Sequence, residues 1–481
     1  MDNTLYYGDN LPILRSHISD NSVDLIYLDP PFNSKADYNV LYKEPTGEPS
    51  AAQITAFEDT WHWSEDSERT FLEITHVAQP TVIEMMRSFR HFIGENDVMA
   101  YLTMMCIRLI ELQRVLTPTG TIYLHCDPTA SHYLKILMDV VFDKRNFRNE
   151  IVWCYRGGGT PKKDFGRRHD IILRYSKSDE YNFFPDLVRI PYQAEGLGRT
   201  DDAMWGKHKG TDKVYKPHPL GKVPEDWWLM NILNANDPER LGYPTQKPLA
   251  LLERIIKSSS QDGQVILDPF CGCGTSITAA QDLNRHWIGI DITHLSINLI
   301  KWRIKHMYGL EARKDYRVIG EPEDLAGALD LASQNRYQFQ WWATSLIDAL
   351  PYGNKKKGSD TGIDGYLYYQ EDTKTINRAI VSVKSGKTSV KDIRDLGHVV
   401  DREKADIGIL ITLQSPTRDM KTEAIKKGFY RSDKINKDFP RLQIFTIEEI
   451  LANKKPLTPP AVQPFKKAES PDKQNLSLDL E

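Results

Sequence analysis

One short stretch limits the fold more than any other, because two prolines end an apolar run there. Residues 23–28 have the composition of a buried strand, and Asp29-Pro30-Pro31-Phe32 follows without a spacer. Prolines cannot continue a sheet, so a carboxylate, a rigid turn and an aromatic ring are presented at the carboxyl end of the strand. Ligands of open α/β sheets bind at that edge. The Asp29 carboxylate and the Pro30 carbonyl are two acceptors suited to an exocyclic amine on a flat ring, on which Phe32 can stack. An ordinary strand-ending turn is the alternative interpretation.

A second stretch, residues 265–276, predicts a strand, a glycine turn and the start of a helix. After the strand it runs Asp268-Pro269-Phe270-Cys271-Gly272-Cys273-Gly274-Thr275. Glycines let backbone approach a ligand closely, and a helix amino terminus favours negative groups. A further strand over 287–290 ends in Asp291, an acidic residue placed to take both ribose hydroxyls of an adenosine. The glycine spacing matches neither dinucleotide enzymes nor phosphate loops. The predicted ligand is therefore an adenosine without a phosphate chain.

Composition narrows the class of protein. A chain of 481 residues predicts two or three domains, and a net charge of −4 confines any nucleic-acid surface to a local patch. Five cysteines without paired metal spacing indicate a reducing compartment rather than a disulfide framework. The first ten residues lack a signal-peptide pattern, and no run has the length of a membrane span. We expect a cytoplasmic protein with no membrane partner.

Strands and helices alternate along the first 300 residues. Apolar spacing predicts four helices, over 11–17 (capped by Asp9 or Asn10), 97–116, 132–142 and 249–258. Two more strands are predicted over 121–127 and 149–155, and residues 33–75 are expected to form a long loop. This alternation predicts a mainly parallel α/β sheet.

A basic insertion interrupts this alternation. Residues 156–222 hold 14 Lys/Arg against 9 Asp/Glu, with aromatic side chains and a run of three glycines between them. Such a segment suits a surface that follows phosphates and contacts bases. We expect a target-recognition insertion over 156–240; a solvated surface excursion is the alternative.

Taken together, these stretches resemble the motifs of DNA amino-methyltransferases. Asp29-Pro30-Pro31-Phe32 resembles the catalytic tetrapeptide of that family, and the stretch from Asp268 to Thr275 resembles its cofactor loop. The catalytic motif precedes the cofactor motif with a basic insertion between them, an order that resembles the beta class. The resemblance covers residues 1–310 and implies a Rossmann-like methyltransferase sheet in circularly permuted order.

The resemblance implies S-adenosylmethionine as cofactor and double-stranded DNA with a flipped adenine as partner. It assigns Asp29 and Pro30 to the exocyclic amine, with Pro31 completing the turn and Phe32 stacking on the base. An aspartate in first place is more typical of adenine-N6 methylation, with cytosine-N4 as the alternative. The remaining assignments concern the cofactor: Asp268, Phe270, Gly272, Gly274 and Thr275 around its methionine and ribose, Asp291 on the ribose hydroxyls, Asp9 and Asn10 near the adenine, and Lys247 near the methionine carboxylate. A homodimer and a separate restriction subunit are further partners to test.

The chemistry requires no covalent enzyme intermediate. An exocyclic amine is a poor nucleophile because its lone pair is delocalised into the ring. Hydrogen bonds to Asp29 and to the Pro30 carbonyl would favour a pyramidal nitrogen with the lone pair directed at the methyl group. The rest is positioning, since the cofactor already carries a good leaving group.

The last third of the chain predicts a second domain over 311–455, followed by a disordered tail over 456–481. Asp364, then Ser382 two residues before Lys384 at a strand end, resemble the Mrr-like form of the restriction-endonuclease-like fold. In that family an acidic pair binds Mg²⁺ and the lysine helps to activate water. Ser382 stands where the family has Glu or Gln, and a hydroxyl is a weak metal ligand. A DNA-binding or degenerate nuclease module, an active nuclease that makes the chain a fused modification–restriction enzyme, and a structural domain are the alternatives.

Overall fold

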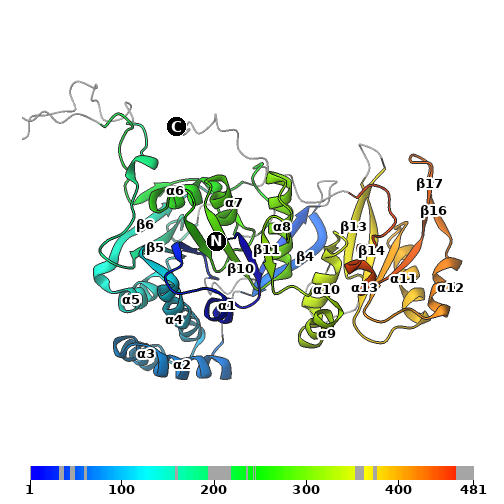
Figure 1. The fold of residues 1–481 in the computed structure, drawn as a ribbon, viewed down its shortest axis with the longest axis horizontal. Helices are drawn as coiled ribbons and strands as arrows, with labels where there is room; N and C mark the ends of the chain where they lie inside the picture. Colours follow the sequence, from blue (N-terminus) through cyan, green and yellow to red (C-terminus); the bar gives the residue numbers. More distant parts are fainter. Residues whose placement is uncertain are drawn as a thin grey trace, which may run out of the picture.

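The protein is described by a computed structural model. It describes residues 2–31, 62–157, 161–192, 218–234, 237–241, 243, 245–352, 362–371 and 376–461, and the backbone alone of 37–43 and 49–58. Two α/β units lie side by side, and the first is built on a large twisted sheet with helices on both faces (Figure 1).

The large sheet is mixed. Its strands, in spatial order, are β11 (Arg317–Ile319), β1 (Thr4–Tyr7), β10 (His286–Asp291), β9 (Val265–Asp268), β2 (Val23–Leu28), β5 (Leu116–Cys126), β7 (His169–Ser176), β6 (Phe147–Cys154) and β8 (Trp227–Leu229). Neighbours from β11 to β5 are parallel, whereas β7 is antiparallel to both β5 and β6. The sheet is therefore parallel where the predicted motifs lie and mixed beyond β5, where β6 and β8 are again parallel to each other.

Alternating side chains of each strand bury the two faces of this sheet. On β2, Ile26 and Leu28 belong to one hydrophobic core and Leu25 and Tyr27 to the other. The first core is covered by α1 (Asn10–His17), α4 (Asp97–Val115) and α5 (Ser131–Phe142), and the second by α6 (Leu249–Ser259), α7 (Thr275–Asp282) and α8 (His294–Tyr308). A further layer of α2 (Glu65–Val77) and α3 (Pro80–Ile93) packs outside α4 (Figure 1). Short 3₁₀ turns occupy Lys144–Asn146 and Pro185–Leu187.

The helices predicted at 11–17, 97–116, 132–142 and 249–258 are confirmed as α1, α4, α5 and α6. The predicted long loop over 33–75 is wrong, because it contains the hairpin β3 (Asp37–Lys43) and β4 (Pro49–Glu58) and the start of α2. The missed signal is an amino-terminal cap: the Ser64 hydroxyl accepts a hydrogen bond from the Ser67 amide, and three acidic residues occupy the first turn of α2. The expected insertion over 156–240 contains β7 and β8, which are strands of the sheet itself.

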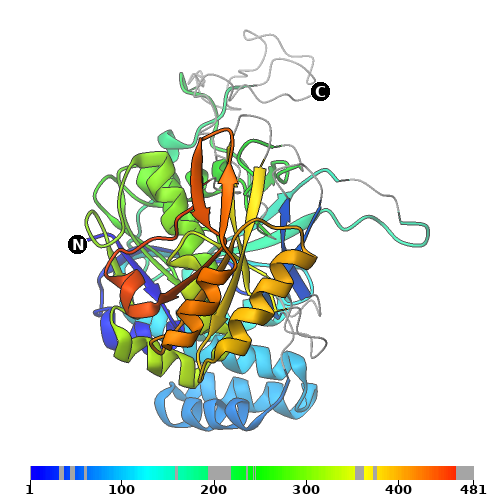
Figure 2. The ribbon, with the colours of Figure 1, turned by 90° about the vertical axis from the view of Figure 1, so that its right-hand side faces the viewer.

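The second unit is a five-stranded sheet with helices on its faces. Its strands run in the order β12 (Leu350–Pro351), β13 (Gly365–Gln370), β14 (Ile376–Lys384), β15 (Gly408–Thr412) and β18 (Leu442–Thr446). The accompanying elements are α9 (Leu325–Gln334), α10 (Arg336–Ser345), α11 (Val390–Arg402), α12 (Arg418–Lys426), α13 (Ile447–Leu451) and the hairpin β16 (Phe429–Ser432) and β17 (Lys437–Pro440). Figure 2 views the molecule from the side of this unit, with α11 and α12 in front. Leu457 exchanges two hydrogen bonds with Gln443, so the chain stays attached beyond residue 456; residues 462–481 of the expected tail lie outside the described residues.

The two units share part of their core. One hydrophobic cluster contains Leu299 and Trp302 of α8 together with Trp341 of α10 and Tyr366 of β13. Helix α10 packs directly on α8. Among the described residues, no helix is long and apolar enough to cross a membrane.

Candidate active site

Four acidic residues lie in a row at one edge of the large sheet. Strands β1, β10, β9 and β2 are neighbours in that order, and their carboxyl ends lead to Asp9, Asp291, Asp268 and Asp29. The chain leaves β1 through α1 on one face and leaves the neighbouring strand β10 through α8 on the other. A crevice opens where neighbouring strands send their connections to opposite faces. The sequence motifs therefore meet at the place where such sheets bind ligands.

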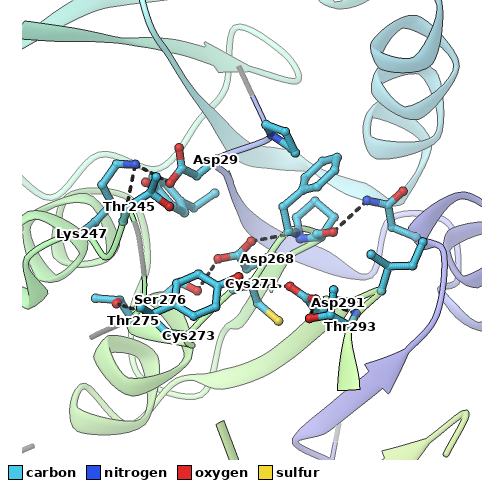
Figure 3. A pocket seen from close by; sticks show the side chains of 18 of the residues that line it. Asp29, Thr245, Lys247, Asp268, Cys271, Cys273, Thr275, Ser276, Asp291 and Thr293 are labelled. Atoms are coloured by element: carbon cyan, nitrogen blue, oxygen red, sulfur yellow. Dashed lines mark hydrogen bonds and ion pairs between the residues drawn. The ribbon is translucent and has the colours of Figure 1, made fainter. Parts of the chain in front are cut away.

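A cavity of about 390 Å³ occupies this edge. That volume is in the range of small-molecule sites. Of the residues predicted for function, Asp9, Asn10, Asp29, Pro31, Lys247, Asp268, Phe270, Gly272, Thr275 and Asp291 line it. Figure 3 shows Asp268 between the Asp29–Lys247 pair on one side and the Asp291–Thr293 pair on the other.

The Asp291 end of the cavity is held by backbone amides. Asp291 Oδ2 accepts a hydrogen bond from the Gly272 amide at 2.9 Å, and Oδ1 accepts from the Thr293 amide and hydroxyl, both at 2.9 Å. Burial raises the pKa of Asp291, and these hydrogen bonds oppose that shift. Gly272 has φ +49°, and a Cβ there would lie 3.3 Å from the Tyr243 ring. The glycine turn and the acidic residue thus form one rigid unit.

Asp268 holds the turn that connects β9 to α7. It accepts a hydrogen bond from the Phe270 amide at 3.0 Å and another from the Ser276 hydroxyl. Burial, with the nearby charges of Asp29 and Asp291, raises its pKa to about 7. Its carboxyl group therefore changes protonation near neutral pH, which is uncommon for an aspartate.

At the α1 end, the cavity wall is tied together across the fold. The Asn10 amide donates to the Pro269 carbonyl at 2.8 Å, which joins α1 to the glycine turn. Arg108 of α4 donates to Asn10 Oδ1 at 2.6 Å and to Asp9 Oδ1 at 2.7 Å. Asp9 also caps α1 by accepting from the Leu11 amide. The two residues expected near an adenine are thus held by hydrogen bonds from several elements.

Asp29 is paired with a lysine far away in the sequence. Lys247 Nζ lies 2.5 Å from Asp29 Oδ2, and their side chains are 9% and 16% exposed. The loop that carries Lys247 has Thr245 in the left-handed region at φ +61°, and the ammonium also donates to the Thr245 carbonyl at 3.5 Å. A buried ion pair therefore connects the two sides of the cavity.

Beneath Asp29, three strands contribute a buried polar row. The Tyr27 hydroxyl lies 2.9 Å from His125 Nδ1, and His125 Nε2 lies 3.1 Å from Asp170 Oδ2. Despite burial, the hydrogen bond from His125 and the charge of Lys247 hold the pKa of Asp170 below its usual value. An ionised Asp170 only accepts, so Nε2 of His125 carries the proton of that hydrogen bond.

The unit that carries this site matches a known protein family. The family model described as DNA methylase (N6_N4_Mtase) matches residues 23–301, more than half of the chain. The chain belongs to this DNA methylase family. Residues 342–451 match a second family model, described as NACHT-associated inactive Restriction Endonuclease 1.

Two relatives of the methylase are similar over most of their length. The type II methyltransferase M.BglII of Bacillus subtilis is 26% identical over 382 residues, which cover 77% of this chain and 84% of the relative. The type II methyltransferase M.HpaI of Haemophilus parainfluenzae is 26% identical over 68% of this chain and 82% of its own. A solved structure of the cytosine-N4-specific PvuII DNA methyltransferase is 13% identical, with a TM-score of 0.38 over 62% of this chain and 86% of that one, too low a score to add to the assignment.

Most residues predicted for the methylase site come together, with three exceptions. Pro30 and Gly274 are not among the residues that line the cavity, and Phe32 lies outside the described residues. Gly274 instead starts α7 at φ +75°, where a Cβ would lie 2.7 Å from Ile300 Cγ1 of α8. Its role in this structure is close packing of two helices.

Sequence reasoning missed several residues of the cavity wall, among them Tyr27, Arg108, Tyr243 and Thr293. Arg108 lies in the helix predicted over 97–116, and it was missed because that helix is largely apolar. A charged side chain within an apolar helix face is itself a signal. Thr293 follows the predicted Asp291 by two residues and caps α8, a pattern that helix-start rules detect.

In the second unit, Asp364 and Ser382, two of the residues that resemble a nuclease site, are hydrogen-bonded to each other. Asp364 Oδ2 accepts from the Val383 amide at 2.7 Å and from the Ser382 hydroxyl at 3.3 Å, while Lys384 ends β14. Within the described part of the chain, no group of three or more His, Cys, Asp or Glu side chains is arranged to hold a metal ion. Asp364 is thus bonded to its neighbouring strand.

Proposed function

We propose that this chain is a site-specific DNA methyltransferase that transfers the methyl group of S-adenosylmethionine to the N6 amine of adenine. One observation carries the proposal: Asp29, at the end of β2, lines the same cavity as the glycine turn and Asp291, at the ends of β9 and β10. The family assignment supports a DNA substrate. The type II relatives support a place in a restriction–modification system.

The residues present fit S-adenosylmethionine. Asp291 offers carboxylate oxygens to ribose hydroxyls, and Gly272 removes the side chain that would obstruct the approach. Asp9 and Asn10 would hold the adenine, and Lys247 would meet the carboxylate of the methionine portion. When bound, the cofactor supplies an activated methyl group on a sulfonium.

The roles of the cofactor-loop residues differ in kind. Phe270 and Thr275 line the cavity and would contact the ligand directly. Asp268 would act through the loop, because its carboxylate holds the Phe270 amide and the Ser276 hydroxyl. Gly274 would act by letting α7 approach α8. We therefore assign direct contacts to the first pair and support of the loop to the second.

The chain's own residues prepare the amine. The Asp29 carboxylate and the Pro30 carbonyl would each accept one amine hydrogen, which orients the nitrogen lone pair across the cavity. After transfer the nitrogen carries one proton too many, and Asp29 is placed to receive it. Pro31 fixes the turn, and Phe32 would stack on the base that has left the helix. All of this is positioning, in line with a reaction that needs no covalent enzyme intermediate.

We further propose that DNA recognition lies in the 156–240 segment outside β7 and β8, since both strands belong to the sheet. The basic excess of residues 156–222 suits phosphate contacts. The catalytic motif at 29–32 precedes the cofactor loop at 268–275 along the chain, which is the permuted order of the beta class.

Nucleoside analysis tests the function. The protein is incubated with unmethylated bacterial DNA and S-adenosylmethionine, and the digested nucleosides are measured by mass spectrometry. We expect N6-methyladenine in the wild type and none with Asp29→Ala, which should still bind cofactor. Asp364→Ala, a carboxylate removed from the other unit, is the matched control and should methylate normally. N4-methylcytosine instead would establish the alternative base, and no methylated base would refute the proposal.

For the second unit we propose a nuclease-like domain that does not cut DNA. Ser382 stands where metal binding needs a carboxylate, and Asp364 is engaged by the Val383 amide. The matching family is described as inactive, which agrees with both observations. A separate restriction subunit would then supply cleavage. Supercoiled unmethylated DNA should stay intact with Mg²⁺ or Mn²⁺; cutting that Asp364→Ala and Lys384→Ala abolish would establish the fused modification–restriction alternative.

A further inference from the structure

Lys247 links the two halves of the site, and it does so through the residue on which the chemistry depends. We propose that Lys247 holds the Asp29 carboxylate in the cofactor-free protein and that the cofactor's own carboxylate displaces Asp29 from it. Cofactor binding would thereby free Asp29 for the target amine. This inference rests on the proposed function and adds an order to it, with the cofactor first and the base second.

The geometry of the pair supports a holding role. The ammonium and the carboxylate are 2.5 Å apart, and both side chains are largely withdrawn from water. Lys247 comes from the loop before α6, and Asp29 from the end of β2. Because partly buried charges are screened weakly, this contact is stronger than a surface ion pair. A carboxylate bound this closely to an ammonium has less capacity to accept hydrogens from an incoming amine.

The charges around the cavity point to Lys247 as the partner of an anionic ligand group. Among the described residues that line the cavity, Arg108 and Lys247 are the side chains with a permanent positive charge. Arg108 already donates to Asp9, to Asn10 and to the Met104 carbonyl, and it lies at the α1 end. Lys247 lies across Asp268 from the Asp291–Thr293 pair (Figure 3). A ligand with its ribose at Asp291 and a carboxylate at its far end would meet the lysine.

An exchange of partners keeps the Lys247 ammonium paired at every stage. If the ligand's carboxylate takes the place of Asp29, Lys247 remains paired, and an unpaired buried ammonium is avoided. Asp29 exchanges one hydrogen-bond donor for another when the amine arrives. Without the ligand, Asp29 stays paired with Lys247, and its carboxylate is less able to accept hydrogen bonds from the target amine. The two sites are therefore coupled, and such coupling is reciprocal.

The consequence is a change in ligand affinity that depends on the ligand's carboxylate. Asp29→Asn removes the competitor for Lys247 while it keeps the shape of the side chain. S-adenosylhomocysteine carries the amino-acid carboxylate but no sulfonium, so its affinity does not report attraction between Asp29 and a positive sulfur. 5′-Methylthioadenosine lacks the amino-acid portion altogether and reports only the nucleoside end.

Isothermal titration calorimetry on the full-length protein tests the inference. We expect Asp29→Asn to bind S-adenosylhomocysteine at least about fivefold more tightly than the wild type, the lower end of usual coupling between sites. Its affinity for 5′-methylthioadenosine should stay within about twofold of the wild-type value. Lys247→Gln should weaken S-adenosylhomocysteine and should abolish the gain from Asp29→Asn in the double variant. Asp364→Asn is the matched control and should change neither ligand.

Two outcomes would overturn the inference: equal S-adenosylhomocysteine affinity in the wild type and in Asp29→Asn, or an equal shift for both ligands. A gain that persists in the Lys247→Gln background would overturn it as well. Failure of the proposed function has a different signature, because the wild-type protein would then bind neither compound.

Discussion

Replacing Asp268 by asparagine should remove a pH dependence of stability that the cofactor loop creates. Burial raises the pKa of this carboxyl group from 3.8 to about 7. At 1.36 kcal/mol per pKa unit, ionising it costs the folded protein about 4 kcal/mol. The sign follows from linkage: the unfolded state ionises near pH 4, so this contribution to stability is complete below pH 4 and is lost as pH rises through 7.

Asp268→Asn keeps the shape and the hydrogen bonds but not the charge. The asparagine oxygen can accept from the Phe270 amide, and its amide group can donate to the Ser276 hydroxyl oxygen. We therefore expect wild type and variant to differ little at pH 4.5. At pH 8 the variant should be more stable, by up to about 4 kcal/mol.

The assay is urea unfolding of both proteins at pH 4.5, 6, 7 and 8, followed by circular dichroism. The difference between the two proteins cancels the titrating groups that do not interact with Asp268, so its slope with pH reports Asp268 and its coupling to Asp29 and Asp291. A difference that stays constant from pH 4.5 to pH 8 would refute the reasoning, and so would a variant that loses stability at high pH.

Two further substitutions test the packing around the site. Gly274→Ala should lower stability by about 1–3 kcal/mol, because its Cβ would meet Ile300 at 2.7 Å. Gly263→Ala, at φ +76° with nothing within 4 Å, measures the backbone cost alone, and an equal loss in both variants would contradict the packing argument. Tyr27→Phe removes one partner of the buried His125 and should cost about 1–3 kcal/mol in unfolding free energy. A loss below a few tenths of a kcal/mol would show that this hydrogen bond contributes little.

Local signals in the sequence identified much of the site. Asp29, Asp268 and Asp291 each directly follow an apolar strand, and parallel strands bring such ends to one edge whatever their order. The strand order itself is a long-range property, and no local pattern contains it. The contact of Lys247 with Asp29 joins residues 218 positions apart, so it appears only in the folded protein.

The basic insertion shows a limit of predicting structure from composition. The charge and glycine content of residues 156–222 predicted an insertion. The apolar strand β7 lies within these residues and was not predicted. Its residues Ile172 and Leu173, which face the two opposite cores of the sheet, are fully buried. Composition averaged over a long segment is insensitive to eight residues that enter the sheet. Strand-by-strand periodicity is the better guide there.

The shared cluster of α8, α10 and β13 gives the second unit a structural role that does not depend on DNA cleavage. Trp302 and Trp341, which are 8% and 6% exposed, belong to the same core although they come from different units. Deleting the second unit would expose a wide apolar face on the methylase, with the loss of stability and the aggregation that follow. The second unit therefore supports the integrity of its neighbour, whatever activity it has of its own.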